Sequence, residues 1–123
     1  MRDRQERLEQ LLNELSKQPG VMGAALVSRD GLSVRSTGKQ ELRRETFSAM
    51  SATVMGAAEI AFAELAPDRL RRLIAETDAG KLIIMGATPD LLLIVYAHAD
   101  AAIADIVPRA EAAAASVASL AAG

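Results

Sequence analysis

The sequence contains no cysteine and no tryptophan, and its aromatic residues are one tyrosine and two phenylalanines. The absence of cysteine excludes disulfides and thiolate metal sites, and it is compatible with a reducing compartment. So few aromatic side chains leave little surface for base stacking. The net charge is −2, and the basic residues form no stripe apart from Arg69, Arg71 and Arg72. We therefore expect no nucleic-acid partner.

Residue patterns that support catalysis are also missing. His98 is the only histidine, and the sequence shows neither a partner that would orient it as a base nor further ligands for a metal. Gly20 and Gly23 precede a strand rather than a helix, which argues against a phosphate-binding glycine loop. We predict that the protein is not an enzyme and that it has no catalytic residue, no bound metal and no cofactor.

The composition is that of a globular protein. The chain has 123 residues, of which half are hydrophobic and about a quarter are charged, so we expect one domain over residues 1–123. The N-terminal segment is charged and has no apolar core, and it does not resemble a signal peptide. We expect a cytoplasmic protein.

Three segments have helical patterns. Residues 3–18 carry leucines at helical spacing and end at Pro19-Gly20, and residues 41–66 form a second helix. The middle of this second helix holds one charge, but its hydroxyl residues and glycine argue against membrane insertion, so it belongs in a core or an interface. Residues 100–121 form the last helix. Either it kinks at Pro108, or Asp105 caps a shorter helix with the proline in its first turn, and we favour the second alternative.

Five segments have strand patterns: residues 21–28, 32–36, 69–78, 81–87 and 91–98. The first two are joined by Arg29-Asp30-Gly31, a hairpin signal. The first, fourth and fifth are nearly continuous apolar runs, which indicates that both faces of the sheet are covered. The segment 69–78 is charged like an edge strand. The resulting fold class is α/β (α+β), a three-layer sandwich in which helix 2 covers one face of an antiparallel sheet and helices 1 and 3 cover the other.

The second helix is apolar on most sides, and its residues fall into three sets. The bulky set is predicted to face the sheet and consists of Phe47, Met50, Val54, Ala57, Ala61 and Leu65. A mostly small set permits close approach of another helix and consists of Ala49, Thr53, Gly56, Ile60 and Ala63. The remaining set consists of Ser48, Ser51, Met55, Glu59 and Phe62.

The chain resembles the Roadblock family of domains from about Leu8 to Leu120. The resemblance is carried by "LEQLLNELSKQPGVMGAALVSRDGLSV", by the small-residue helix, by "GKLIIMGA" and by "LLLIVYAHAD". It implies a five-stranded antiparallel sheet with strand order 2-1-5-4-3 and the topology αββαβββα. It also implies a homodimer in which the third strands pair edge to edge and the second helices pack side by side.

Family members commonly bind and regulate small Ras-like GTPases or serve as scaffolds, so the resemblance implies such a partner here. The implied dimer contact consists of Ala49, Thr53, Gly56, Ile60 and Ala63 with Leu73 and Ile74, and Gly56→Leu is expected to weaken it. The implied GTPase-facing surface consists of Ser48, Ser51, Met55, Glu59 and Phe62. Two alternatives remain open, a small-molecule sensor and a structural subunit without nucleotide dependence. Arg43 and Arg44 fit a solvated helix start better than an arginine finger.

Overall fold

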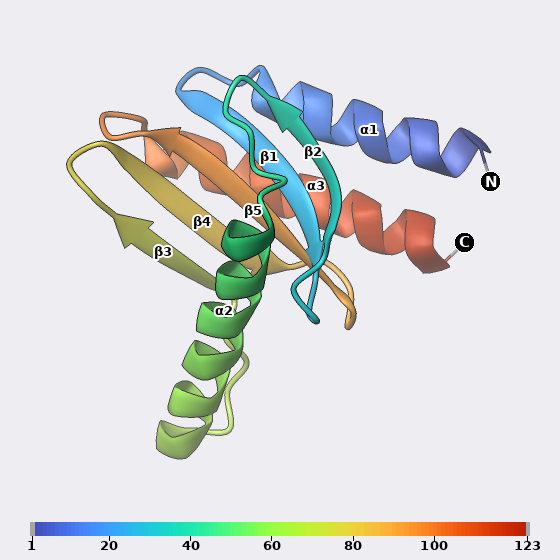
Figure 1. Cartoon of the computed structure of the whole chain (residues 1–123). Helices are drawn as coiled ribbons and strands as arrows, with labels where there is room; N and C mark the ends of the chain where they lie inside the picture. Colours follow the sequence, from blue (N-terminus) through green and yellow to red (C-terminus); the bar gives the residue numbers. More distant parts are fainter. Residues whose placement is uncertain (1, 123) are drawn as a thin grey trace.

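The computed structural model describes residues 2–122, which form a five-stranded sheet between two layers of helices (Figure 1). The elements are, in chain order, α1 (Arg2–Ser16), β1 (Val21–Ser28), β2 (Ser33–Gly38), α2 (Glu45–Leu65), β3 (Arg72–Glu76), β4 (Gly80–Gly86), β5 (Leu91–His98) and α3 (Ile103–Ala122). All strand pairs are antiparallel and the strand order is β2-β1-β5-β4-β3. The predicted fold class, element order and strand order are therefore confirmed.

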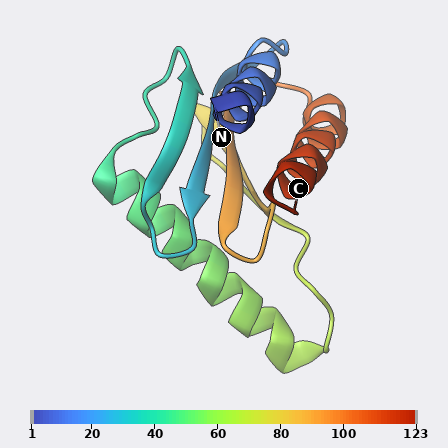
Figure 2. The same ribbon diagram turned by 90° about the vertical axis from the view of Figure 1, so that its right-hand side faces the viewer.

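The central strand β1 explains why its sequence does not alternate between apolar and polar residues. Ala24 and Leu26 belong to the buried cluster beneath α1 and α3, whereas Ala25 and Val27 belong to the cluster beneath α2. All four side chains are fully buried. Figure 2 shows α1 and α3 on one side of the sheet and α2 on the other. A strand covered on both faces needs apolar residues at consecutive positions.

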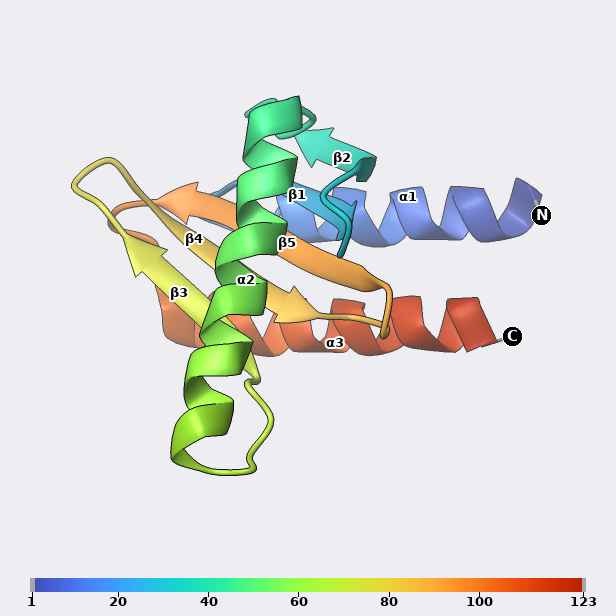
Figure 3. The ribbon, with the colours of Figure 1, turned by 60° about the horizontal axis from the view of Figure 1, so that its bottom comes forward.

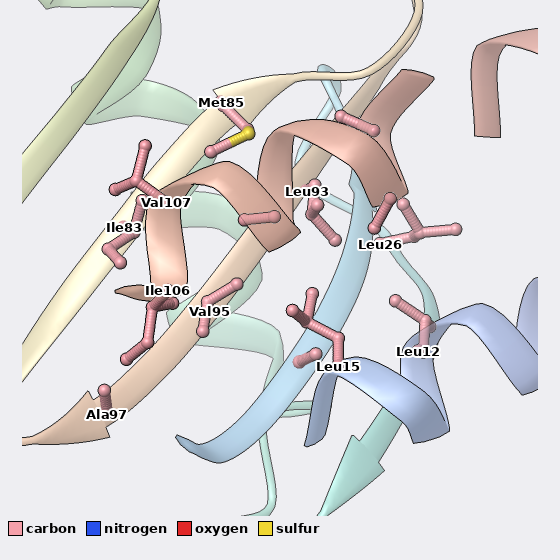
Figure 4. Packing of buried hydrophobic residues seen from close by; sticks show 14 of the residues in the cluster. Leu12, Leu15, Leu26, Ile83, Met85, Leu93, Val95, Ala97, Ile106 and Val107 are labelled. Atoms are coloured by element: carbon pink, nitrogen blue, oxygen red, sulfur yellow. The ribbon is translucent and has the colours of Figure 1, made fainter. Parts of the chain in front are cut away.

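The larger core lies between the sheet and the helices α1 and α3 (Figure 4). Leu12 and Leu15 of α1, Leu93 and Val95 of β5 and Ile106 of α3 meet there, and each is at most 3% exposed. Apolar burial of this extent is the main stabilising contribution to a domain of this size. Two helices of the same chain, α1 and α3, cover this face of the sheet (Figure 2).

The predicted turn at Arg29-Asp30-Gly31 between β1 and β2 is confirmed. The Gly31 N–H donates to the Ser28 carbonyl (2.9 Å), and Gly31 has φ +91°. This backbone conformation favours glycine because a side chain would be strained there. A Cβ atom at Gly31 would also lie 2.9 Å from the Cα atom of Ala49 in α2. The turn therefore packs directly against the beginning of α2.

Two predicted segments, 41–66 and 69–78, are each five residues longer than the element that forms. The helix predicted from residue 41 begins at Glu45, because Leu42 is 3% exposed and anchors an extended segment in the cluster beneath α2. The strand predicted over 69–78 is confined to Arg72–Glu76. It ends before Thr77, whose N–H and hydroxyl both donate to the Gly80 carbonyl, so the chain turns there.

The favoured alternative for Pro108 is wrong. The helix α3 begins at Ile103, and the N–H groups of Asp105 and Ile106 donate to the carbonyl of Ala102. Asp105 is therefore inside the first turn, where a carboxylate is favourable near the positive end of the helix dipole. Pro108 lies inside the helix beyond the first turn, where its ring removes one backbone donor.

Candidate interaction surface

The helix α2 crosses the sheet, and its C-terminal half extends past the sheet (Figures 1 and 3). Only Ser48, Ser51 and Met55 of α2 are buried, and every residue from Ile60 to Leu65 is exposed. This exposed end is apolar: Ile60 is 70% exposed, Phe62 is 51% and Leu65 is 83%. Large exposed apolar surface of this kind is typical of a binding site for another protein.

The predicted orientation of α2 is wrong. Met50 and Val54, which the sequence placed against the sheet, are 55% and 46% exposed, and Leu65, Ala57 and Ala61 of the same set are also exposed. Only Phe47 of this set packs partly against the core. The apolar residues are spread around the whole helix, so bulk alone did not identify the buried face.

Three residues of the predicted GTPase-facing set are in the core instead of at the surface. Ser48 is 1% exposed, Ser51 is 4% and Met55 is 1%. The sheet beneath them carries large side chains, including Ile84, Leu92 and Ile94. Small serines let the helix approach these side chains closely, and Met55 fills the remaining gap. The prediction of a surface role for these three residues is therefore wrong.

The other two residues of that set remain accessible. Phe62 lies on the exposed half of α2. The Glu59 side chain is 33% exposed and accepts a hydrogen bond from Arg29 Nη1 at 2.9 Å. This ion pair links α2 to the turn between β1 and β2. An exposed pair of this kind contributes at most about 1 kcal/mol, so it orients the helix more than it stabilises the fold.

The predicted dimer residues lie on one flank of α2 and on β3. Ala49 packs against Gly31 of the same chain, whereas Thr53, Ile60 and Ala63 are exposed. A Cβ atom at Gly56 would have no neighbour within 4 Å. On β3, Leu73 packs against the core beneath α2 and Ile74 is 37% exposed. The helix residues lie on the flank that begins at the turn between β1 and β2, whereas Leu73 and Ile74 lie on the edge strand β3 at the other end of the strand order. The role of these residues in a dimer stays a prediction.

The two edges of the sheet are β2 and β3. Each pairs with one neighbour within the chain, so the outer backbone groups of each edge are available for pairing. The edge strand β2 and the turn before it also expose Leu32 (67%) and Val34 (48%). Sequence reasoning missed this second apolar area, because both residues were assigned to the strand over 32–36 without a preferred face.

The segment before α2 carries a local ion pair. The Glu41 carboxylate accepts hydrogen bonds from the Arg43 backbone N–H (2.7 Å) and from the Arg43 guanidinium (3.3 Å). The guanidinium and the N–H of Arg43 hold the pKa of the Glu41 carboxyl below its usual range. Arg44 is the residue before the helix and makes no side-chain capping bond. These contacts fit the predicted solvated helix start.

The described residues do not include a metal centre. No group of three or more His, Cys, Asp or Glu side chains in residues 2–122 is arranged to hold a metal ion. His98 is exposed at the end of β5, and its backbone N–H donates to the carbonyl of Gly20. Within residues 2–122, α2 is the one helix that is long and apolar enough to span a membrane by length and composition, with 22% of its apolar stretch buried.

Comparisons with known proteins agree with this architecture. The uncharacterized protein MJ0310 of Methanocaldococcus jannaschii is 30% identical over 88 residues, which cover 72% of this chain and 77% of that protein. The crystal structure of a Roadblock/LC7 domain from Streptomyces avermitilis superposes with a TM-score of 0.85 at 21% identity, covering 93% of this chain and 97% of that one.

A second solved structure has the same fold. The gliding protein MglB from Thermus thermophilus superposes with a TM-score of 0.82 at 20% identity, covering 95% of this chain and 90% of that one. At this level of identity the superpositions establish the fold alone. The sequence match to the Roadblock/LC7 domain spans residues 7–97, which is most of the chain. The protein therefore belongs to the Roadblock/LC7 domain family.

Proposed function

We propose that this protein is a non-enzymatic homodimeric interaction module that binds and regulates a small Ras-like GTPase. The observation that carries the proposal is the exposed apolar half of α2 beside the open edge strand β3. An apolar helix that its own sheet does not cover requires another protein surface. The family resemblance supports both a second copy of the chain and a GTPase as the proteins that cover it.

The dimer contact has two candidate flanks on α2. Ala49 packs against Gly31 of the same chain, so the flank with Ala49, Gly56 and Ile60 starts at the turn between β1 and β2. Helical geometry places the flank with Met50 and Val54 on the other side of the helix. We propose that the second copy packs on the flank formed by Met50, Val54, Ala57, Ala61 and Leu65, with Leu73 and Ile74 at the pairing edge.

In this arrangement the opposite flank of α2 is left for the GTPase. Its accessible residues are Thr53 and Ile60. Phe62 is also exposed, but residues two positions apart point to different sides of a helix, so Phe62 lies outside this flank. Ile60 is 70% exposed, so it is the main apolar contact that this flank offers to a partner. Glu59 lies at the border of this surface, where its carboxylate is already paired with Arg29.

The test is to mix the purified protein with a purified Ras-like GTPase in its GDP and GTP-analogue forms. Gel filtration should show a complex with one nucleotide form, and the hydrolysis or exchange rate should change. The variant Ile60→Arg should lose the complex while light scattering still reports a dimer. A complex that is identical with both nucleotides would instead favour a structural subunit, and no complex at all would contradict the proposal.

A small-molecule sensor is less consistent with the packing. Such a function needs a cavity with a few convergent polar groups. Both faces of the central strands are filled by buried apolar side chains, including Leu26, Val27 and Ile94. A thermal-shift screen with nucleotides and metabolites that gives a clear increase in melting temperature would favour the sensor over the interaction module.

A further inference from the structure

A cavity of about 410 Å³ lies at the end of the sheet where β1 and β4 finish and β3 and β5 begin. Three connections line it: the turn after β1, the turn between β4 and β5, and the loop from α2 to β3. The middle of α2 and the middle of α3 complete its walls through Glu59 and Glu111. The cavity is therefore built from segments that are far apart in the sequence, and we call it the arginine pocket.

The arginine pocket carries excess positive charge on a protein whose net charge is −2. Arg29 is paired with Glu59 at 2.9 Å, and Arg72 of the adjoining β3 is paired with Glu111 at 3.1 Å. Arg69 and Arg71 also line the pocket, and neither forms an ion pair with a carboxylate of residues 2–122. Two exposed guanidinium groups are thus available to an anionic ligand.

The backbone of the loop presents these two arginines together. Leu70 packs against the core beneath α2, and its neighbours Arg69 and Arg71 are exposed. Anchoring the loop through Leu70 limits how far the arginines can separate. A guanidinium group binds a carboxylate through two parallel hydrogen bonds, and such charge-assisted bonds are among the stronger ones in proteins.

The walls of the pocket favour a peptide over a compact polyanion such as phosphate. The residues of α2 and α3 that reach it lie in the middle of these helices, so no helix N-terminus within residues 2–122 supplies backbone N–H groups to it. Glu59 and Glu111 line the same cavity and are paired with Arg29 and Arg72, so the guanidinium groups of the pocket without a carboxylate partner in residues 2–122 are those of Arg69 and Arg71. Two separate groups suit single carboxylates spaced along a peptide better than one ion of high charge density. Leu70 and Pro89 add apolar lining, which suits a segment that alternates acidic and apolar side chains.

We infer that the arginine pocket binds an acidic segment of a partner protein, with carboxylate side chains held by Arg69 and Arg71 and apolar side chains against Leu70. Arginine clusters are a recurring device for recognising acidic motifs. This site goes beyond the proposed function. It lies at the end of the sheet where the β1–β2 and β4–β5 turns are, and it recognises the negative charge of a partner instead of the nucleotide state of a GTPase.

The test uses a fluorescein-labelled peptide of Glu-Leu-Glu repeats and the full-length protein, with fluorescence anisotropy as the measurement. We expect binding at low ionic strength that weakens as salt is added. The double variant Arg69→Glu/Arg71→Glu should bind at least about tenfold more weakly, because each arginine contributes charge-assisted hydrogen bonds. A Lys-Leu-Lys peptide should prefer this variant to the wild type.

The matched control is Arg4→Glu/Arg7→Glu on α1, which makes the same change in net charge at exposed positions. It should retain most of the affinity. Three results would overturn the inference: no binding of the Glu-Leu-Glu peptide to the wild type, equal loss in both double variants, or displacement of the peptide by millimolar inorganic phosphate that exceeds the effect of sodium chloride at the same ionic strength. No GTPase is present, and light scattering on the same samples reports the dimer, so failure here is distinguishable from failure of the proposed function.

Discussion

The two faces of the sheet are covered to different extents. On one face, α1 and α3 bury a continuous cluster that includes Leu12, Leu93 and Val117, each fully or almost fully inaccessible. On the other face, α2 covers a smaller cluster with Met55 and then extends past the sheet, where Ile60 and Leu65 are exposed. The first face is closed by helices of the same chain, and the second leaves apolar side chains of α2 exposed, which is where the proposed function places association.

The largest expected effect tests whether a second copy completes the α2 face. Replacing Val54 with Asp puts a carboxylate in the proposed contact twice, because a twofold interface contains each residue two times. An unpaired buried charge is strongly destabilising, so association should weaken more than about a hundredfold. Analytical ultracentrifugation over a range of concentrations measures the dissociation constant.

The control is Val34→Asp. Val34 is 48% exposed and Val54 is 46% exposed, but Val34 lies on the opposite edge strand β2. Its substitution should leave the dimer intact. Gly56→Leu reports on the other flank of α2. If Gly56→Leu gives monomers and Val54→Asp does not, the contact is on the Gly56 flank and the flank proposed here is wrong.

The second prediction compares neighbouring residues that point to opposite faces of β5. Leu93 belongs to the cluster beneath α1 and α3, and Ile94 belongs to the cluster beneath α2, and both are fully buried. Truncation of such residues to alanine costs about 2–5 kcal/mol. Leu93→Ala should fall near the upper end, and Ile94→Ala near the lower end because α2 can move toward the cavity.

The measurement for this pair is urea unfolding at one fixed protein concentration, since the proposed dimer would make the apparent stability depend on concentration. An equal loss of unfolding free energy in the two variants would show that α2 is packed as firmly as α1 and α3. The contrast between the two faces would then be limited to the exposed end of α2.

The fold was predictable from the sequence because its signals are local and consistent. Continuous apolar strands predict a sheet covered on both faces, the Asp30-Gly31 pair predicts a turn, and the leucine spacing of residues 3–18 predicts α1. These signals agree with the resemblance to the Roadblock family, and that resemblance implies the strand order that the structure has.

The orientation of α2 was not predictable in the same way. Its apolar residues surround the helix, so the periodicity that normally identifies a buried face is weak. The choice depends on tertiary fit: the large side chains of the sheet accept Ser48 and Ser51, not Met50 and Val54. The arginine pocket was also missed, because its arginines and its walls come from segments that only the fold brings together.

The third prediction concerns the contact that fixes the beginning of α2 against the β1–β2 turn. Gly31 has φ +91°, and a Cβ atom there would lie 2.9 Å from Ala49 Cα. Gly31→Ala should therefore cost about 1–3 kcal/mol of unfolding free energy.

Gly56→Ala is the control, because a Cβ atom there meets no neighbour within 4 Å, and alanine in a helix should stabilise by about 0.5–1 kcal/mol. Thermal unfolding of both variants measures the difference, and a loss of stability in Gly56→Ala would contradict it.

The smallest expected effect concerns the segment that leads into α2. Hydrogen bonds from Arg43 lower the pKa of the Glu41 carboxyl, so the pair adds stability above the ordinary glutamate pKa and loses it as the pH falls through the lowered value. The pair is exposed, and Leu42 between the two residues carries the anchoring contact with the core. Arg43→Ala should therefore raise the pKa of Glu41 in an NMR titration and leave the thermal midpoint at neutral pH nearly unchanged. A Glu41 pKa that is equal in both proteins would contradict the assigned cause, and a large loss of stability would mean that the ion pair, and not Leu42, fixes the start of α2.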